Sequence, residues 1–354
     1  MKIALITDTH WGVRNDNIAF MDNSKKFLDE VFFPYLDDNN VRTVVHLGDL
    51  VDRRKYINMQ TATRLRIDFL DKLANRGLDV HMIAGNHDTY FKNTNRINAL
   101  HELVVGKYDF KIHDQLPFEW DFDGTFVLML PWICDENREA SLYAIRTTSA
   151  QIVMGHLELQ GFEMFRGSIV SHGDDPSLFD RFDTVMSGHY HHRSSRGNIH
   201  YLGSHAEFTW SDYSDPRGFH IFDTKTRNLT FVENPYRMFK KVWYNDADST
   251  FLNSDIDYAQ YKNCMLKVIV QEKTNLFWFD KFIENIESEN PLDIQIVEDH
   301  LNLNLEEDSD IVNEAESTID IFKKYISGFD EKTVNKEKLE KKIVELYNEA
   351  LSVE

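Results

Sequence analysis

With 354 residues, 42% of them hydrophobic, the chain can form one large domain and one or two small ones, and no apolar stretch is long enough to span a bilayer. The formal net charge of −20 argues against a stand-alone, nonspecific nucleic-acid binder. Residues 284–320 contribute thirteen Asp and Glu residues and no Lys or Arg, so the rest of the chain carries a charge of only −7.

The first 200 residues alternate between strand and helix patterns. Five short apolar runs are expected to form buried strands, because continuous apolar runs are typical of strands covered on both faces. These runs cover residues 3–6, 43–45, 80–84, 151–154 and 184–186. Amphipathic stretches predict helices over about 21–36, 60–76 and 95–104, and the second should stop at Gly77.

A predicted hairpin pairs residues 118–122 with 126–130 across the Asp123-Gly124 turn, and a helix is expected over 136–147. Three later runs are expected to be strands that close a second sheet. They cover 199–202, 218–223 and 229–232. Strands that alternate with helices and are followed by a run of strands predict an α/β sandwich of two sheets flanked by helices.

The pattern changes near Pro235. An expected strand, helix and strand at 264–270, 276–286 and 292–297 form a β-α-β unit, which predicts a small accessory domain. An acidic segment follows and is expected to be a linker, and two amphipathic helical segments come after it. We find no internal repeat, and we divide the chain into residues 1–234, 235–298, 299–310 (the linker) and 311–354 (the helices).

Each of the five early strands is followed at once by residue types that bind metal ions. The segments are Asp8-Thr9-His10, Gly48-Asp49-Leu50-Val51-Asp52, Gly85-Asn86-His87-Asp88, Gly155-His156 and Gly188-His189-Tyr190-His191. Because parallel strands place their carboxyl ends at one edge of a sheet, we expect the five loops to converge on one crevice. A mixed set of Asp, His and Asn ligands suits Mn²⁺ or Fe²⁺ better than Mg²⁺ alone.

We assign these residues to two cations that share one carboxylate. Metal A would be held by Asp8, His10, Asp49 and His191, and metal B by Asp49, Asn86, His156 and His189. Asp49 is the expected bridge because one carboxylate can hold two ions about 3.5–4 Å apart. Such a pair of cations activates a water as the nucleophile and clamps the oxygens of a phosphate group.

His87 follows the ligand Asn86 directly and is the expected general acid, or a stabiliser of the charge on the phosphorane. That role requires an acceptor for its other ring nitrogen, and Asp52 is our candidate. Asp88 is the alternative acceptor, although it could equally cap the following turn. Taken singly, each segment is weak evidence, since Asp-x-His occurs more often in simple turns. The signal is the ordered set of five.

This ordered set resembles the signature of the calcineurin-like metallophosphoesterases, and the resemblance covers about residues 1–234. Within that superfamily the chain is most similar to SbcD-type double-strand-break repair nucleases, especially the recombination endonuclease subunits of tailed phages. The similarity continues beyond two of the five segments, so that the similar stretches there cover residues 85–93 and 155–158. It also includes 215–219 (Asp-Pro-Arg-Gly-Phe), which is expected to be a turn without a ligand role. Beyond residue 235 the order of the predicted elements is similar to that of the family, but no sequence motif is shared.

The resemblance implies a DNA nuclease with 3′-to-5′ exonuclease and single-strand endonuclease activity that depends on two Mn²⁺ ions, with Mg²⁺ or Fe²⁺ as alternatives. It implies an SbcC-type coiled-coil ATPase as the partner, bound through 311–354, and roles in recombination, repair and DNA degradation. It also implies that residues 235–298 form a capping domain that positions DNA. Two copies of the chain would dimerise through residues of about 58–104. Some cellular members carry His where this chain has Asp52, which leaves the balance between the two nuclease modes open.

Basic residues close to the expected ligands are candidates for DNA contact. They are Arg14, Arg53, Arg54, Lys55, Lys92, Arg166, Arg193 and Arg196. The simpler interpretation is that they are ordinary solvated charges, and we expect about half of them to touch DNA. The ATPase partner would supply the remaining affinity, which would explain an acidic subunit in a DNA-processing complex.

Two other functions compete with the nuclease interpretation. A phosphoprotein or small-phosphoester phosphatase is favoured by residues 49–53 (Asp-Leu-Val-Asp-Arg), which are close to the phosphatase motif. Against it, Asp88 stands where those enzymes usually carry Glu. A non-catalytic scaffold is disfavoured because every ligand and His87 are retained, and unpaired ligand clusters are costly to bury.

The cellular compartment is predicted from two features. The amino terminus does not resemble a signal peptide, because charges and a turn follow residues 1–7 at once. Cys134 and Cys264 are the two cysteines of the chain, and we expect reduced thiols rather than a disulfide. Both features favour a cytoplasmic protein, in the host cytoplasm if a phage encodes it.

Overall fold

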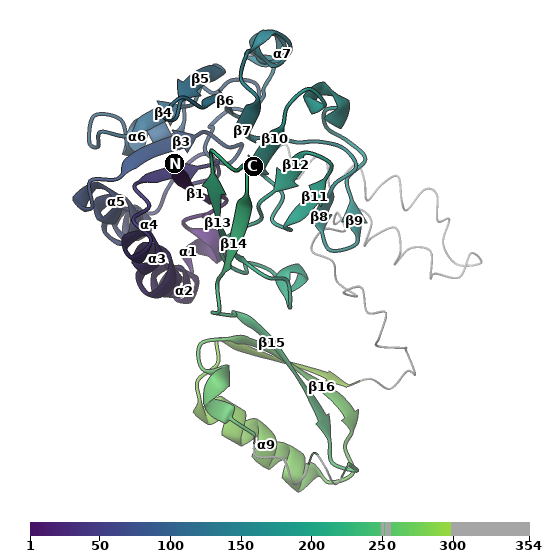
Figure 1. The fold of residues 1–354 in the computed structure, drawn as a ribbon. Coiled ribbons are helices and arrows are strands. Elements are labelled where there is room, and N and C mark those ends of the chain that lie inside the picture. Colours follow the sequence, from purple (N-terminus) through teal and green to yellow (C-terminus); the bar gives the residue numbers. More distant parts are fainter. Residues whose placement is uncertain (249–250, 252–255, 299–354) are drawn as a thin grey trace, which may run out of the picture. The chain divides into compact units, whose positions relative to one another are not determined.

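The computed structural model describes residues 1–248, 251 and 256–298, which contain two large sheets and a smaller accessory unit (Figure 1). The expected linker at 299–310 and the helices expected within 311–354 lie outside these described residues. In the part that is described, no helix is long and apolar enough to cross a membrane. Cys134 and Cys264 are both buried, and both are free thiols.

Two six-stranded sheets form the larger part of the molecule. The first contains, in spatial order, β14 (Leu229–Glu233), β13 (Gly218–Asp223), β1 (Lys2–Ile6), β2 (Thr43–His46), β3 (Asp79–Ile83) and β4 (Lys111–His113). The second contains β11 (Ser194–Arg196), β12 (Ile199–Tyr201), β10 (Thr184–Gly188), β7 (Ile152–His156), β6 (Phe126–Leu130) and β5 (Phe118–Asp121). Strands β1 to β4 are parallel to one another, and so are β6, β7, β10 and β12.

The two sheets share a core, which covers one face of each sheet. Ile3 and Leu5 of β1 pack in this core with Met154 of β7. The intervening residues Ala4 and Ile6 belong to a second core, which the first sheet shares with helices. Because successive side chains of a strand point to opposite faces, β1 contributes to both cores. The predicted two-sheet α/β sandwich flanked by helices is confirmed.

The helices of this sandwich are shorter than expected. They are α1 (Val13–Asp16), α2 (Ile18–Phe27), α3 (Phe33–Asp38), α4 (Met59–Leu65), α5 (Asp71–Asn75), α6 (Ala99–Leu103) and α7 (Arg138–Thr147). The long helices expected over 21–36 and 60–76 are each interrupted by a π-helical turn, at Leu28–Phe32 and Arg66–Leu70. Next to the first of these turns, Pro34 has no N–H to donate, so regular α-helical bonding cannot continue through it.

Two of the three strands expected to close the second sheet belong to the first sheet instead. Only β12 lies in the second sheet, where it pairs with β10. β13 and β14 extend the first sheet, with His220 of β13 opposite Leu5 of β1 in antiparallel register. β13 is apolar on both faces, since Phe222 enters the core between the sheets and Ile221 packs in the helix-covered core. It therefore fits beside the fully buried β1.

The predicted hairpin of β5 and β6 is confirmed, but β6 has a second neighbour. It also pairs with β7 in parallel, so that Leu130 at its carboxyl end lies opposite Gly155. The loop after β6 therefore starts at the same sheet edge as the loop after β7. The longer segment that follows β7 carries a short hairpin of β8 (Glu163–Phe165) and β9 (Ser168–Ile169).

The accessory unit beyond Pro235 is a three-stranded parallel sheet that packs on one helix. Its elements are β15 (Phe239–Asn245), β16 (Met265–Glu272), α9 (Leu276–Ser288) and β17 (Asp293–Glu298). Leu266 and Val268 pack against Phe279 and Phe282 in its core. β16, α9 and β17 match the expected β-α-β unit, whereas β15 was missed because two lysines interrupt its apolar pattern. The separate role of 235–298 stays a prediction.

Gly188, which precedes the expected ligand His189, occupies a position without room for a methyl group. A Cβ atom there would lie 2.0 Å from Thr7 Oγ1 and 2.6 Å from the main-chain oxygen of Leu47. Because a backbone oxygen in a buried sheet cannot easily move, we expect Gly188→Ala to lower the free energy of unfolding by about 3 kcal/mol or more. Urea denaturation with a chelator present measures this loss.

Gly124→Ala in the β5–β6 turn is the matched control for this prediction. Its Cβ would meet nothing within 4 Å, so only its φ of +81° disfavours alanine, at a cost of about 1 kcal/mol. Equal losses of stability in the two variants would contradict the close approach at Gly188.

Candidate metal centre

The carboxyl ends of β1, β2 and β3 in the first sheet and of β7 and β10 in the second sheet meet at one site. Main-chain hydrogen bonds join the first loops, since the N–H of Asp8 donates to the carbonyl of Gly48 (3.0 Å) and that of His10 to the carbonyl of Asp49 (3.1 Å). The N–H of His189, which directly follows β10 of the second sheet, donates to the Asp8 carboxylate (3.1 Å). The five loops therefore converge across two sheets rather than along one.

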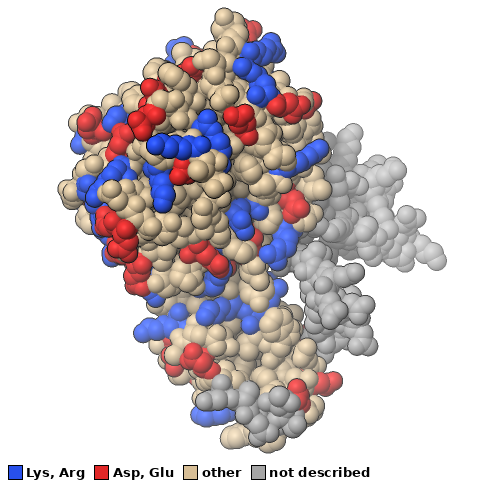
Figure 2. All heavy atoms as spheres, viewed as in Figure 1, with Lys and Arg blue, Asp and Glu red and all other residues tan. Residues whose placement is uncertain are grey.

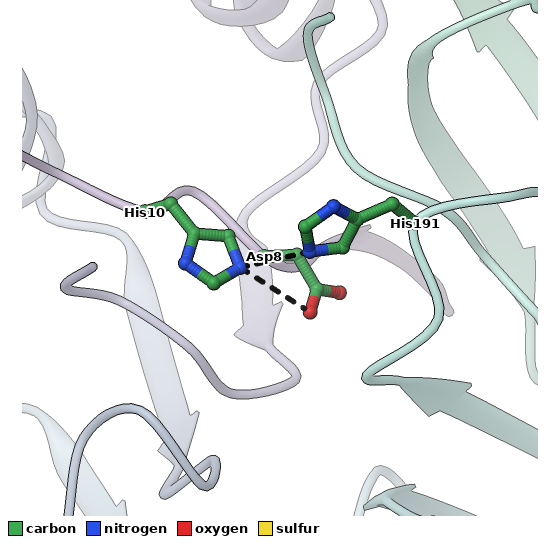
Figure 3. Close-up of side chains that lie close together, drawn as sticks. All are labelled: Asp8, His10 and His191. Atoms are coloured by element: carbon green, nitrogen blue, oxygen red, sulfur yellow. Dashed lines mark hydrogen bonds and ion pairs between the residues drawn. The ribbon is translucent and has the colours of Figure 1, made fainter. Parts of the chain in front are cut away.

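Asp8, His10 and His191 form the first cluster of candidate ligands (Figure 3). The Nε2 atoms of His10 and His191 are 2.9 Å apart, and His10 Nε2 lies 3.9 Å from Asp8 Oδ1. Figure 3 shows the two imidazole rings and the carboxylate directed toward one another. Two imidazole nitrogens and a carboxylate oxygen around a common point are the ligand types expected for metal A.

Asn86, His156 and His189 form the second cluster, together with Asp49. Asn86 Oδ1 lies 3.0 Å from His156 Nε2 and 2.9 Å from His189 Nδ1. The Oδ2 atom of Asp49 lies 3.3 Å from His156 Nε2. His156 Nδ1 is 2.7 Å from the carbonyl oxygen of Leu47, so it donates there and leaves Nε2 to face the cluster. These are the ligand types expected for metal B.

Asp49 lies within reach of both clusters. Its Oδ2 atom is 3.7 Å from Nε2 of His10 in the first cluster and 3.3 Å from Nε2 of His156 in the second. Its Oδ1 atom accepts the N–H of His87 at 2.7 Å. A carboxylate between two sets of ligands is the arrangement that a pair of cations about 3.5–4 Å apart requires. All seven expected metal ligands thus lie in one site.

The charges and burial of the site fit divalent cations. Asp8, Asp49 and Asp88 are each at most 1% exposed, and within the described ranges none of them pairs with Lys or Arg. Burial raises the pKa of Asp8 to about 7, which shows how poorly this pocket tolerates an uncompensated carboxylate. Burial also lowers the pKa of His189 to about 3 and that of His191 to about 4. Both rings are therefore neutral near pH 7, as metal ligands must be, whereas, against the effect of burial, the nearby charge of Asp49 raises the pKa of His156 to about 9, so His156 would lose a proton on binding a cation.

Four residues of the site have a left-handed backbone, which is uncommon outside glycine. The φ angle is +50° at Asp8, +42° at His10, +55° at Asp49 and +91° at His189. Such conformations persist only where the surroundings fix them, and they cluster at functional sites. The motif glycines provide the necessary space, because a Cβ atom on Gly48 would lie 2.3 Å from the ring of His156.

His87 lies beside the first cluster, with its ring edge-on to that of His10 at 4.9 Å. Its Nδ1 atom is 2.5 Å from the main-chain oxygen of Asp52, so Nδ1 donates there and Nε2 is left for a substrate. We expected the Asp52 carboxylate as the acceptor. That carboxylate lies 3.6 Å from Nδ1 of His10 and within 4.8 Å of a ring nitrogen of His87. The carboxylate of Asp88, the alternative acceptor, receives main-chain N–H groups of Gly85, Leu50 and Val51.

Arg217 contacts a ligand loop, although residues 215–219 were expected to form only a turn. Its guanidinium is 2% exposed and donates to the main-chain oxygen of His191. The same group lies 2.7 Å from Asp212 and 2.9 Å from Asp215. Two carboxylates therefore hold Arg217 in place, and Arg217 in turn holds the loop that carries His191. The Arg within the motif at 215–219 was the sequence signal that could have pointed to this role.

We expect Arg217→Lys to weaken Mn²⁺ binding by roughly 10- to 100-fold, the range seen when groups that orient a metal ligand are changed. Lysine keeps the charge but lacks the planar fork that reaches Asp212, Asp215 and His191 together. Isothermal titration calorimetry measures the affinity. Arg181→Lys is the matched control, because Arg181 also donates to main-chain oxygens (2.7 and 2.9 Å) but away from the site. Equal affinities for Arg217→Lys and wild type would contradict the role.

Trp132 is a second residue near the site that the sequence did not single out. It follows β6, and its ring lies 5.3 Å from the ring of His189 and 6.2 Å from that of His156. Residues 126–130 were assigned only to a hairpin, so the loop after them was not considered. Their parallel pairing with β7 places Trp132 beside the second cluster.

The basic candidates for DNA contact differ in how the protein holds them. Arg53 pairs with Asp16 (2.8 Å), and Arg166 donates to the carbonyl of Ser214 (3.0 Å). Arg54 is half-buried near Asp49, whose charge opposes the fall that burial causes in the pKa of Arg54. Its Nη1 atom is buried and has no hydrogen-bond partner among the residues the structure describes. A contact between Arg54 and a phosphate stays a prediction.

The other basic candidates lie beside aromatic rings or are exposed. Arg14 is 5.9 Å from the ring centre of Phe239, and Arg193 lies over the ring of Phe231 at 4.3 Å. Lys55, Lys92 and Arg196 are exposed. On the face shown in Figure 2, basic and acidic side chains are interleaved rather than separated. Contact between DNA and any of these residues stays a prediction.

Comparison with known families assigns this site to a class. A model of the calcineurin-like phosphoesterase family matches residues 1–193, which contain the seven candidate ligands, His87 and Asp52. The chain therefore belongs to the calcineurin-like phosphoesterases, a family with a dinuclear metal site. The family indicated by the sequence motifs is confirmed.

Relatives narrow this class to nuclease subunits. Exonuclease subunit 1 of Enterobacteria phage T4 is 34% identical over 291 residues, which cover 81% of this chain and 82% of the relative. The D subunit of nuclease SbcCD from Staphylococcus saprophyticus is 26% identical over 282 residues, covering 70% and 73%. The corresponding protein of Staphylococcus epidermidis is 24% identical over 275 residues, covering 66% and 69%. The predicted similarity to SbcD-type and phage nucleases is confirmed, and the chain is a phosphodiester hydrolase of this type.

Proposed function

We propose that this chain is the nuclease subunit of a two-component DNA-processing enzyme, with 3′-to-5′ exonuclease and single-strand endonuclease activity that depends on two Mn²⁺ ions. The observation that carries the proposal is the pair of ligand clusters that share Asp49, in a chain whose relatives are nuclease subunits. Imidazole ligands on both sides of Asp49 favour Mn²⁺ over Mg²⁺.

The residues of the site have two roles in phosphodiester cleavage, metal binding and proton donation. Asp8, His10 and His191 would hold one cation and Asn86, His156 and His189 the other, with Asp49 shared. The bound pair supplies an activated water and compensates the charge of the phosphate. His87 contributes a proton of its own: with Nδ1 held by the carbonyl of Asp52, a protonated Nε2 can donate to the leaving oxygen.

The names of the relatives support proposals about partners. All three are named as subunits, and two of them belong to nuclease SbcCD, which supports an SbcC-type coiled-coil ATPase as the partner of this chain. We assign ATPase binding to 311–354, homodimer formation to about 58–104 and DNA positioning to 235–298. The complex would act on DNA in the cytoplasm, that of the host if a phage encodes it, in recombination, repair and DNA degradation.

A cleavage assay tests the proposal. Purified protein is incubated with end-labelled single-stranded or duplex DNA and Mn²⁺ or Mg²⁺, with and without the ATPase and ATP. We expect cleavage of both substrates with Mn²⁺, and products that shorten from the 3′ end. Hydrolysis of a phosphopeptide without cleavage of DNA would overturn the proposal in favour of a phosphatase. Failure of the Mn²⁺-loaded protein to hydrolyse any of these substrates would favour a scaffold.

A further inference from the structure

A pocket adjoins the second ligand cluster next to the loops that follow β6 and β7. It has a volume of about 200 Å³ and is lined by Trp132, Ile133, Arg138, Glu158, Gly173 and Asp174. Trp132 is both a wall of this pocket and a neighbour of the candidate ligand His189. We infer that the pocket binds one unpaired nucleobase of the DNA substrate, stacked on the indole of Trp132. This inference rests on the proposed nuclease function and names the part of the substrate that the site recognises.

The size of the pocket suits a single planar ring system. Pockets for drug-sized ligands typically measure about 300–1,000 Å³, so this one is smaller than a whole nucleotide-sized ligand needs. A base whose sugar and phosphate stay outside is the part of a DNA strand that such a space accommodates.

The main chain holds Trp132 in place before any substrate binds. Its N–H donates to the carbonyl of Ala84 at 2.8 Å. Its own carbonyl oxygen accepts from the side-chain amides of Asn95 (2.8 Å) and Asn137 (3.0 Å). Because the backbone that carries the indole is already ordered, stacking of a ring on it costs less conformational entropy.

Three of the other lining residues are charged, namely Arg138, Glu158 and Asp174. Arg138 pairs with Asp174, with 3.3 Å between Nη1 and Oδ2, and Glu158 lies 3.4 Å from His172. A nucleobase has apolar faces and hydrogen-bonding edges, so it matches an aromatic wall beside polar groups. A tryptophan that only supported His189 would be enclosed, whereas Trp132 is partly exposed at the pocket.

The base in this pocket must be unpaired. A base within a duplex stacks on its neighbours and pairs with the other strand, so its faces are not free to contact an indole. Single strands and frayed ends expose such faces, and stacking of this kind tolerates any base sequence. The pocket therefore favours cleavage at single-stranded or melted ends.

Oligonucleotides that lack one base test the inference. Each substrate is single-stranded and carries an abasic residue at one of the three terminal nucleotides of either end, and kcat/KM is measured with Mn²⁺. For the wild type, we expect loss of the base at one position to lower kcat/KM by roughly tenfold to a hundredfold. Trp132→Ala should lower cleavage of the intact substrate by a similar factor and make that position insensitive to the missing base.

Controls separate stacking from support of the metal site. Trp132→Phe keeps an aromatic face and should retain most of the sensitivity, and Tyr143→Ala removes an exposed aromatic side chain elsewhere and should behave as wild type. The inference is overturned if the missing base lowers kcat/KM of Trp132→Ala by the same factor as it lowers kcat/KM of the wild type. It is also overturned if no missing base lowers kcat/KM of the wild type. If Trp132→Ala does not fold, the wild-type series and Trp132→Phe still decide. Absence of any DNA cleavage by the wild type would reject the proposed function instead.

Discussion

Asp49→Asn is expected to reduce Mn²⁺-dependent DNA cleavage by about a thousandfold or more, which corresponds to about 4 kcal/mol of transition-state stabilisation. The substitution removes the charge that lies between the two ligand clusters, 3.7 Å from His10 and 3.3 Å from His156. A neutral amide also cannot bridge two cations as a carboxylate does. Single-turnover cleavage of labelled DNA at saturating Mn²⁺ measures the loss.

Calorimetry of the same variant shows why activity falls. We expect the Asp49→Asn protein to bind fewer than two Mn²⁺ ions per chain. Asp123→Asn, the same change in the exposed β5–β6 turn, should leave stoichiometry and rate unchanged. Cleavage by Asp49→Asn within tenfold of the wild-type rate would show that Asp49 is not shared between the cations.

His87→Ala is expected to lower cleavage by roughly 10²- to 10⁴-fold while leaving Mn²⁺ binding intact. The side chain of His87 belongs to neither cluster that we assign to the cations, and its Nδ1 is held by the main chain of Asp52. Removal of the ring therefore deletes a proton donor but not a ligand of either cluster. Calorimetry for Mn²⁺ and single-turnover cleavage, made on the same preparation, separate the two effects.

Asp52→Ala is the informative companion of His87→Ala. Alanine keeps the main-chain oxygen that holds His87 and loses only the carboxylate, which lies near the rings of His10 and His87, so we expect a smaller loss of roughly 10- to 100-fold. If Asp52→Ala is as inactive as His87→Ala, the carboxylate does more than the geometry indicates. If His87→Ala no longer binds Mn²⁺, His87 is a ligand rather than a proton donor.

The site could be anticipated from the sequence because each ligand directly follows a short buried strand. The continuous apolar runs at 3–6 and 43–45 indicate strands that are covered on both faces. Such strands can be predicted from the sequence without knowing which strands they pair with. The residues after them, Asp8 and Asp49, then share an edge by topology alone. The meeting of this edge with the carboxyl ends of β7 and β10 depends on how the two sheets pack, which the sequence does not show.

Sheet membership was harder to predict because it is decided by packing over long distances. The run at 218–223 is apolar on both faces and would suit either sheet, and its pairing with β1 depends on contacts about 215 residues apart in the chain. The parallel partner of β6 was likewise hidden by its local hairpin. This is why the sequence did not indicate Trp132.

The supporting contacts of the site could not be predicted for a different reason. Sequence patterns identify residue types, but the main-chain oxygen of Asp52 is an acceptor that any residue would provide. Arg217 was visible as part of a motif, yet its contact with His191 depends on how two loops of the folded chain meet. Both contacts become apparent only when the backbone is known.

The central claim is that one carboxylate is shared by two cations. The most direct measurement is anomalous diffraction from crystals of the protein grown with Mn²⁺. We predict two anomalous peaks about 3.5–4 Å apart, one beside Asp8, His10 and His191 and the other beside Asn86, His156 and His189, with Asp49 contacting both. A single peak, or two peaks that do not share Asp49, would contradict the claim.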